Sequence, residues 1–297
     1  SKGFTCNEFD QSKNKISENI EIQIIKHDFY DSSISIKTPD TNILNLNDCP
    51  LREISEIKKF KKKYGTFDIL LTQFSYAAWK GGEHEKVVRE NAAKEKLVDI
   101  SNQSKILNCK KIIPFASFIY FSNKLNFYMN DSVNSPETVY DYLTKSLLNP
   151  IIMQPGEKQF VNQLRQNKSS LEFWKDKFEF NSQNKGIDIY KKSYKLEEIQ
   201  NEFIKYQKKI FSKNSKALIY FLHKFNFLGA FQKLNIFFVD NKSNYEYSIF
   251  SGIKKTDNKE HDISMHSESL SFIFKNEFGF DTLTVNGCFE CSPKNFS

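Results

Sequence analysis

Two apolar segments separated by a long helical segment dominate the first 120 residues. Residues 66–75 (TFDILLTQFS) are almost continuously apolar, which predicts a strand buried on both faces, and residues 110–118 (KKIIPFASF) have the same character. Residues 82–107 between them predict a helix. Upstream, the pattern predicts further strands at 20–25, 33–37 and 42–47, followed by a helix at 51–64 that stops at Gly65. Strands alternating with helices of this length indicate βα units in a layered α/β sheet.

The length and composition are those of a chain that can bury a large core. With 297 residues and 39% hydrophobic content, one large domain and a smaller one are expected. No apolar run approaches the ~20 residues of a membrane span, and residues 1–10 have neither the basic region nor the apolar region of a secretion signal. The five cysteines are scattered and odd in number, as is typical of free thiols. We therefore expect a cytoplasmic protein.

The basic residues show no motif for nucleic-acid binding. The net charge is +7, from 43 basic and 36 acidic residues. The densest run, KKFKKK at 58–63, lies on the predicted helix, which favours a solvated face over a phosphate-binding or nucleic-acid-binding patch. The aromatic run at 217–239 resembles a lipid-binding surface, but its lysines and Gly229 favour core strands with turns. We expect a small-molecule substrate and neither nucleic acid nor a membrane as a partner.

Polar or aromatic clusters follow three consecutive predicted strands. If these strands are parallel neighbours, their carboxyl ends converge on one edge of the sheet, where open α/β sheets bind ligands. The clusters would otherwise be ordinary loops. The candidate substrate-binding residues from the second and third clusters are Gln73, Ser75, Tyr76, Trp79, Phe115 and Ser117.

Asp48 is the middle residue of the first of these clusters, Asn47-Asp48-Cys49, and Pro50 follows the cluster. A carboxylate at the carboxyl end of a buried strand is a candidate site residue. It is equally a candidate N-cap for the helix that Pro50 would open. The pattern around Asp48 leaves both interpretations open.

The second half of the chain has a different character. We expect an α/β domain at 1–150, a polar helical connector at 151–216 and an α+β module at 217–297. In that module, the alternation in TLTVNG at 282–287 predicts a strand, and residues 266–276 predict a helix. His261 and His266 lie in a polar stretch without a metal-binding motif and are expected at the surface.

Four segments in order carry a resemblance to a known superfamily. They are HDFYDSSISI, ILNLNDC, FDILLTQFSYAAWKGG and KKIIPFASF. Over roughly residues 15–130 the chain resembles the later part of a metallo-β-lactamase-fold domain, of the kind found in CMP-N-acetylneuraminate hydroxylase and its bacterial relatives. The resemblance implies a layered αββα sandwich whose N-terminal part precedes these residues.

The same resemblance implies a metal-dependent function. Asp48 matches a metal ligand of the superfamily, and His27 matches a histidine that is a candidate ligand for zinc or iron. The defining H-x-H-x-D-H motif is absent from the 297 residues, so this chain alone is expected to bind metal weakly or not at all. The resemblance favours an enzyme, a hydrolase or a hydroxylase-like oxygenase acting on a sugar or nucleotide-sugar. The alternative is a metal-free ligand-binding or scaffold protein derived from that fold.

Overall fold

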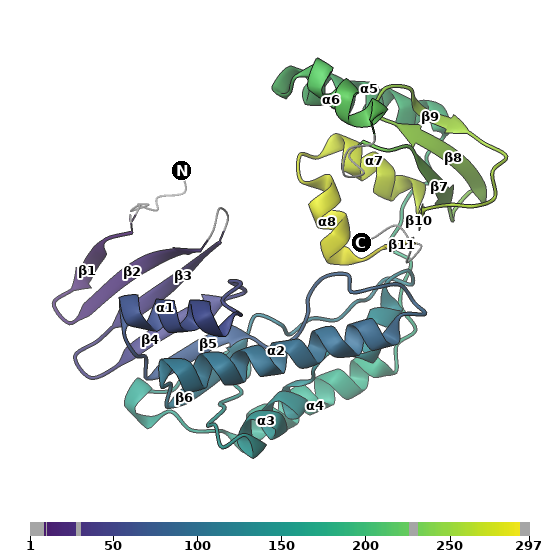
Figure 1. Cartoon of the computed structure of the whole chain (residues 1–297). Helices are drawn as coiled ribbons and strands as arrows, with labels where there is room; N and C mark the ends of the chain where they lie inside the picture. The colour runs from purple at the N-terminus through teal and green to yellow at the C-terminus, as the bar shows by residue number, and fades with distance from the viewer. Residues whose placement is uncertain (1–8, 10, 28–30, 226–230, 292–297) are drawn as a thin grey trace, which may run out of the picture. The chain divides into compact units, whose positions relative to one another are not determined.

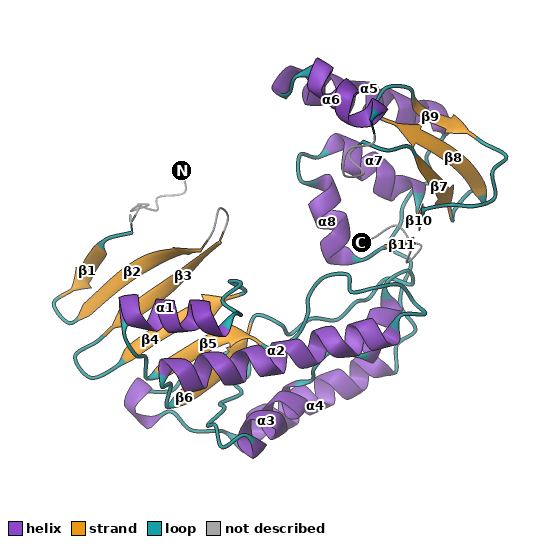
Figure 2. Ribbon diagram, viewed as in Figure 1, coloured by secondary structure: helices purple, strands orange, loops and turns teal. Residues whose placement is uncertain are grey.

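The computed structural model describes residue 9 and residues 11–27, 31–225 and 231–291. The chain forms two compact units. The first comprises residues 1–77, 90–120 and 132–184, and the second comprises residues 78–89, 121–131 and 185–297. Each unit contains one β-sheet with helices, so the described residues form a mixed α/β structure with two mixed sheets (Figures 1 and 2).

The first unit is organised around a six-stranded sheet in sequential order. Its strands are β1 (Lys13–Ser17), β2 (Ile20–His27), β3 (Asp31–Lys37), β4 (Asn42–Asn47), β5 (Ile69–Gln73) and β6 (Lys111–Phe115). The first four strands are antiparallel, whereas β4, β5 and β6 are parallel. The carboxyl ends of β4, β5 and β6 therefore share one edge, as the sequence predicted. Because β2 and β4 are both antiparallel to β3, the carboxyl end of β2 lies at that edge too.

Apolar side chains on both faces of this sheet explain its burial. Leu44 and Leu70 pack with Ile57 and Phe60 of α1 (Ile54–Tyr64) and with Leu107 of α2 (Lys86–Leu107). Figure 1 shows both helices over the same face of the sheet. On the other face, three buried residues pack together: Ile69, Ile151 and Leu164. Two further helices, α3 (Pro136–Lys145) and α4 (Lys168–Ser182), and a short 3-10 helix, η2 (Val161–Gln163), complete the unit.

The second unit holds a five-stranded sheet in the order β11-β10-β7-β8-β9. Its strands are β7 (Leu234–Phe238), β8 (Ser243–Ser248), β9 (Gly252–Lys255), β10 (Ile263–Met265) and β11 (Phe289–Cys291). Its helices are α5 (Leu196–Lys213), α6 (Lys216–Lys224), α7 (Ser267–Lys275) and α8 (Gly279–Asn286), with the 3-10 helix η1 (Phe127–Asp131). Phe203 of α5, Phe238 of β7 and Phe274 of α7 pack in its core.

Two sequence predictions in this unit are wrong in whole or in part. Residues 282–286, expected in a strand, belong to α8, which ends where Gly287 adopts a left-handed φ of 66° and donates its N–H to the Leu283 carbonyl. In the run at 217–239, expected as core strands, β7 confirms the prediction at its end, but the run begins with α6, because the Ser215 hydroxyl accepts from Leu218 N and caps a helix. None of the described helices is long and apolar enough to cross a membrane.

Candidate functional site

The loop from β4 to α1 places Asp48 at the carboxyl edge of the first sheet. Asn47 has a left-handed φ of 52°, and its Nδ2 donates to Asp48 Oδ1 at 2.6 Å. Helix α1 begins only at Ile54, and its N-cap, Glu53, makes no side-chain capping bond. The interpretation of Asp48 as an N-cap is therefore wrong. Pro50 disfavours helical backbone at Cys49, and residues 50–53 lie between Asp48 and the start of the helix.

His27 ends β2 at the same edge and is held from two sides. Its Nε2 lies 2.8 Å from the Ser33 hydroxyl, and its ring stacks on Phe60 with 5.6 Å between the ring centroids. In the β2–β3 ladder His27 pairs with Asp31, a residue that the sequence analysis did not select. The strand register thus brings a second carboxylate to the edge that carries Asp48.

Both carboxylates act on the Cys49 thiol. Burial, and then the negative charges of Asp31 and Asp48, raise its pKa to about 12. A thiol whose pKa is raised in this way stays protonated at neutral pH and is not an activated nucleophile. Asp31 and Asp48 are therefore both near enough to the buried thiol to act on its ionisation.

The residues at this edge do not fit a closed metal centre. Tight zinc and iron sites use three or four protein ligands. Within residues 9, 11–27, 31–225 and 231–291, no three His, Cys, Asp or Glu side chains form a group that could hold a metal ion. The assignment of Asp48 and His27 as metal ligands remains a prediction.

A cleft of about 450 Å³ opens beside His27. One face of α1 forms a wall of the cleft, because residues 56, 59, 60, 63 and 64 follow helical i, i+3, i+4 spacing. The residues that line the cleft are Ile25, Lys26, His27, Pro50, Leu51, Glu56, Lys59, Phe60, Lys63 and Tyr64. The Lys63 ammonium lies 5.0 Å from the centroid of the Tyr64 ring. The cleft thus combines the two lysines and the glutamate of this helix face with two aromatic rings and an imidazole.

Hydrogen bonds from α2 fix the loop that borders this cleft. Gln103 Nε2 donates to the Leu51 carbonyl at 2.8 Å, and Gln103 Oε1 accepts from the Thr72 hydroxyl at 3.1 Å. Gln103 is buried, so both bonds are shielded from water. The position of Leu51 in the cleft wall is therefore tied to strand β5.

Farther along the edge, Ser75 and Ser117 are buried and hold loops together. Ser117 Oγ donates to the Ser75 carbonyl at 3.0 Å and accepts from Phe74 N at 3.2 Å. Ser75 Oγ accepts from Asn134 N, and Asn134 Nδ2 donates to the carbonyls of Phe74 and Ala93. These hydrogen bonds account for the burial of both serines. Their role in substrate binding remains a prediction.

The remaining predicted substrate residues divide between the two units. Gln73 and Phe115 are register partners at the ends of β5 and β6, and Gln73 Oε1 accepts from Lys96 Nζ. Tyr76 is buried in the first unit. Trp79 belongs to the second unit, where its Nε1 donates to the Tyr128 hydroxyl at 3.2 Å.

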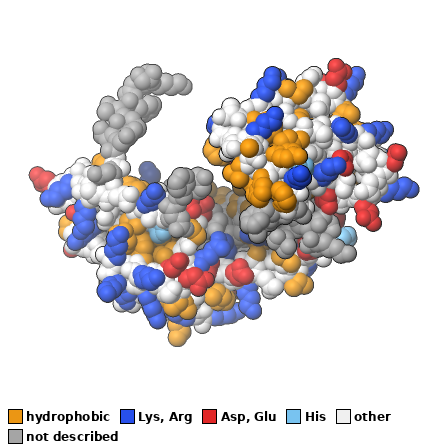
Figure 3. Space-filling model, turned by 45° about the horizontal axis from the view of Figure 1, so that its top comes forward, with side chains coloured by type: hydrophobic (Ala, Val, Ile, Leu, Met, Phe, Trp, Pro, Cys, Tyr) orange, Lys and Arg blue, Asp and Glu red, His pale blue; other side chains and the backbone are white. Residues whose placement is uncertain are grey.

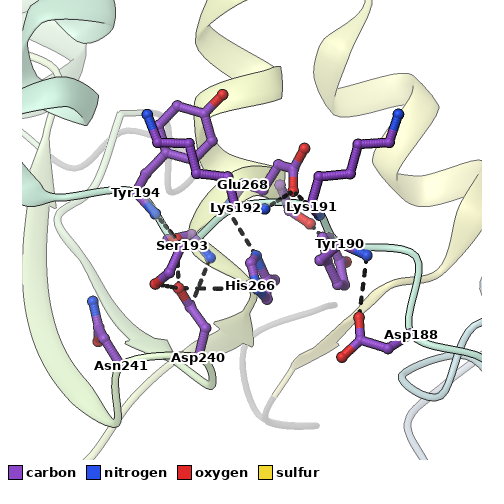
Figure 4. Close-up of polar contacts among 12 residues, drawn as sticks. Asp188, Tyr190, Lys191, Lys192, Ser193, Tyr194, Asp240, Asn241, His266 and Glu268 are labelled. Carbon is purple, nitrogen blue, oxygen red and sulfur yellow. Dashed lines mark hydrogen bonds and ion pairs between the residues drawn. The ribbon is translucent and has the colours of Figure 1, made fainter.

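A separate polar cluster in the second unit surrounds Asp240 (Figure 4). The Asp240 carboxylate accepts from Ser193 Oγ, from Ser267 Oγ at 2.6 Å and from Ser267 N at 2.9 Å. Burial raises the pKa of Asp240, but these hydrogen bonds outweigh burial, so that the pKa lies below its usual value. His266, expected at the surface, has a side chain only 12% exposed, with Nε2 3.9 Å from Asp240 Oδ2.

This Asp240 cluster lacks the geometry of a nucleophilic triad. In a triad the serine hydroxyl bonds to the histidine, whereas both serines here bond to the aspartate. His266 Nδ1 accepts from Glu268 N at 3.1 Å, and the ring stacks on Tyr190 with 3.8 Å between centroids. The cluster therefore caps α7 and anchors residues 190–194 to its start.

Comparisons with known proteins give no family assignment. No family model and no curated protein matches the chain. Among solved structures, a point mutant of CmlA β-hydroxylase has a TM-score of 0.33 and 9% identity, over 49% of this chain and 31% of that chain. CmlA from Streptomyces venezuelae, a diiron β-hydroxylase, has a TM-score of 0.31 and 10% identity, over 48% of this chain and 31% of that chain.

A third solved structure gives a still lower score. A protein of unknown function from Enterococcus faecalis V583 has a TM-score of 0.22 and 13% identity, over 66% of this chain and 47% of that chain. This chain thus spans less than half the length of each of these three proteins. Similarities at these scores carry no argument about its function, which has to come from its own residues.

Proposed function

We propose that the first unit binds a small anionic ligand with a planar ring, of the nucleotide or nucleotide-sugar class, in the cleft between β2 and α1. The observation that carries this proposal is the composition of the cleft wall. Lys59 and Lys63, with Glu56 on the same helix face, line the cleft beside the aromatic surface of His27, Phe60 and Tyr64. This is the chemistry of the metal-free binding protein that the sequence analysis kept as an alternative.

Two physical arguments support this ligand class. Lysine ammonium groups bind phosphate as point charges, and aromatic rings stack on a nucleobase. The cleft volume of about 450 Å³ lies within the range of small-molecule sites. The resemblance to the CMP-N-acetylneuraminate hydroxylase branch makes a cytidine nucleotide the natural first probe.

The test is calorimetric titration of the protein with cytidine 5′-monophosphate and with cytidine. Lys59→Ala is expected to weaken nucleotide binding roughly five-fold, because one exposed charge contact contributes about 1 kcal/mol. Lys62→Ala is the matched control, since Lys62 is exposed on the same helix and does not line the cleft. Equal losses in the two variants, or equal binding of cytidine and the nucleotide, would contradict the proposal.

A second candidate is the metal-dependent hydrolase or oxygenase that the resemblance implies, acting on a sugar or nucleotide-sugar. What supports it is that Asp48 and His27 lie at one sheet edge together with Asp31. It requires metal ligands beyond those that the described residues bring together. Elemental analysis after reconstitution with zinc or iron tests it, with Asp48→Ala compared with Asp40→Ala at an exposed turn. This candidate is supported if the wild type and Asp40→Ala bind metal and Asp48→Ala does not. It is contradicted if Asp48→Ala holds as much metal as the wild type.

A further inference from the structure

The excess positive charge of the chain is concentrated in one segment. Residues 203–239 contain seven lysines and neither aspartate nor glutamate, so this segment alone accounts for the net charge of +7. The basic and acidic residues outside it are equal in number. Four of these lysines, Lys205, Lys209, Lys213 and Lys233, pair with glutamates that lie outside the segment. The positive field around α6 therefore comes from Lys216 and Lys224 at its two ends, together with Lys208.

Helix α6 combines this charge with an exposed apolar stripe. Leu218, Phe221 and Phe225 follow i, i+3, i+7 spacing and are 56%, 50% and 63% exposed. The rings of Phe221 and Phe225 contact each other, with 4.7 Å between centroids. Hydrophobic side chains gather next to lysines on the face of the second unit that Figure 3 shows.

The opposite side of α6 is anchored to the second unit. Ile219 is buried in the core, and the His223 ring lies 5.1 Å from the Phe250 ring. His223 Nδ1 also lies 2.6 Å from the Phe231 carbonyl oxygen. Because these contacts engage one side of the helix, the stripe of Leu218, Phe221 and Phe225 is the side that α6 presents outward.

We propose that this outward side of α6 docks on an anionic lipid surface. An interfacial helix inserts apolar side chains at the depth of the headgroups while lysines at its margins bind anionic lipids. Lys216 and Lys224 stand at the two ends of α6, and the Lys216 ammonium lies 5.3 Å from the Phe211 ring. The charge of this surface is complementary to anionic lipid. The proposal departs from the expectation that the protein has no membrane partner.

The apolar stripe favours lipid over nucleic acid as the partner. Protein surfaces that bind single-stranded nucleic acid expose aromatic rings, on which the bases stack, within a positively charged groove. Here Leu218 adds an aliphatic side chain to the same helical row as Phe221 and Phe225, which matches insertion among acyl chains. Binding to nucleic acid is therefore an outcome that the experiment must detect.

The test is co-sedimentation of the full chain with vesicles of phosphatidylcholine alone and with 30% phosphatidylglycerol. Binding is expected only to the anionic vesicles and is expected to weaken with salt. Phe221→Ser combined with Phe225→Ser should reduce partitioning at least about ten-fold, and Lys224→Glu at least about five-fold.

Matched controls come from the first unit. Leu147→Ser replaces a leucine that is 95% exposed, and Lys62→Glu replaces a lysine in the other basic run. Both controls should partition as the wild type does. The proposal is overturned if the wild type does not prefer anionic vesicles, or if the controls lose as much binding as the α6 variants. It is also overturned if the chain binds DNA instead of vesicles and the double serine variant binds DNA unchanged.

Discussion

The two units hold their loops with different chemistry. In the first unit, neutral groups join the loops that follow β5 and β6, through Ser75, Ser117 and Asn134. In the second unit, a buried ion pair joins residues 78–89 to residues 121–131: Arg89 is 1% exposed and binds both oxygens of Asp131. Neutral networks keep their strength across pH, whereas buried charges depend strongly on their partner and on protonation. The two units should therefore respond differently to mutation and to acid.

The chain offers a reporter for each unit. Its two tryptophans divide between them, because Trp174 stacks on Phe118 in the first unit and Trp79 contacts Phe289 in the second. Trp79→Phe therefore leaves fluorescence from the first unit, and Trp174→Phe leaves fluorescence from the second.

The largest effect is expected from Asp131→Ala in the second unit. It leaves the Arg89 guanidinium buried without its carboxylate, which should lower the free energy of unfolding by about 3 kcal/mol. Urea unfolding followed through Trp79 measures this change. Asp141→Ala is the control, because Asp141 is exposed on α3. If the two variants unfold alike, the ion pair does not hold the second unit.

A smaller effect is expected from Asn134→Ala in the first unit. This variant removes two donors and leaves the carbonyls of Phe74 and Ala93 buried without them, at a cost of about 2 kcal/mol. Unfolding followed through Trp174 measures the change at pH 7 and pH 4. Since the lost hydrogen bonds are neutral, the loss in free energy of unfolding relative to wild type should be the same at pH 7 and pH 4. A loss that changes strongly with pH would show that charged groups also hold these loops.

Acid should act on the second unit through Asp240. Its pKa is lower in the folded protein than its usual value, so its contribution to stability is present above the usual aspartate pKa and is lost as the pH falls through the folded value. Asp240→Asn should therefore unfold more easily than wild type at neutral pH and should approach it below about pH 4. Unfolding curves at several pH values check this. If the difference in stability between wild type and Asp240→Asn grew in acid, the predicted direction of the pH dependence would be wrong.

The smallest effect is expected from Ala116→Gly, and it should be stabilising. Ala116 has a left-handed φ of 61°, which costs a residue with a side chain roughly 1 kcal/mol. Glycine removes this strain, but it also increases the entropy of the unfolded chain, which offsets part of the benefit. The free energy of unfolding should therefore rise by about 0.5 kcal/mol. Thermal unfolding followed through Trp174 measures it. A loss of stability would show that the Ala116 methyl group packs productively.

The sequence predicted the parallel half of the first sheet well, for a physical reason. Strand β5 has buried residues on both faces, whereas β6 alternates buried with half-buried residues, and neither short apolar run shows a helical period. The prediction failed at α8, where alternating threonine and apolar residues fit a strand while Gly287 supplies a helix stop. It failed at α6 because a short aromatic run fits a helix and a strand equally well.

The candidate site was predicted only in part. The convergence of the strand ends followed from the order of the elements, and it placed Asp48 at the correct edge. Asp31 was missed because its position depends on the β2–β3 register. The lysines of α1 were predicted to be solvated, and only the packing of the helix beside His27 shows that Lys59 and Lys63 line a cleft. The sequence also gives no sign that Trp79 N donates to the Thr284 carbonyl, 205 positions later.

The most direct test of the binding proposal is to observe His27 while ligand is added. The ring resonances of the five histidines can be followed by NMR, with His27 assigned through His27→Gln. On titration with cytidine 5′-monophosphate, the His27 signals should shift in step with the calorimetric binding curve, because the ring lies in the cleft wall. If the nucleotide binds while the His27 signals stay unmoved, the ligand occupies another place and the proposed site is wrong.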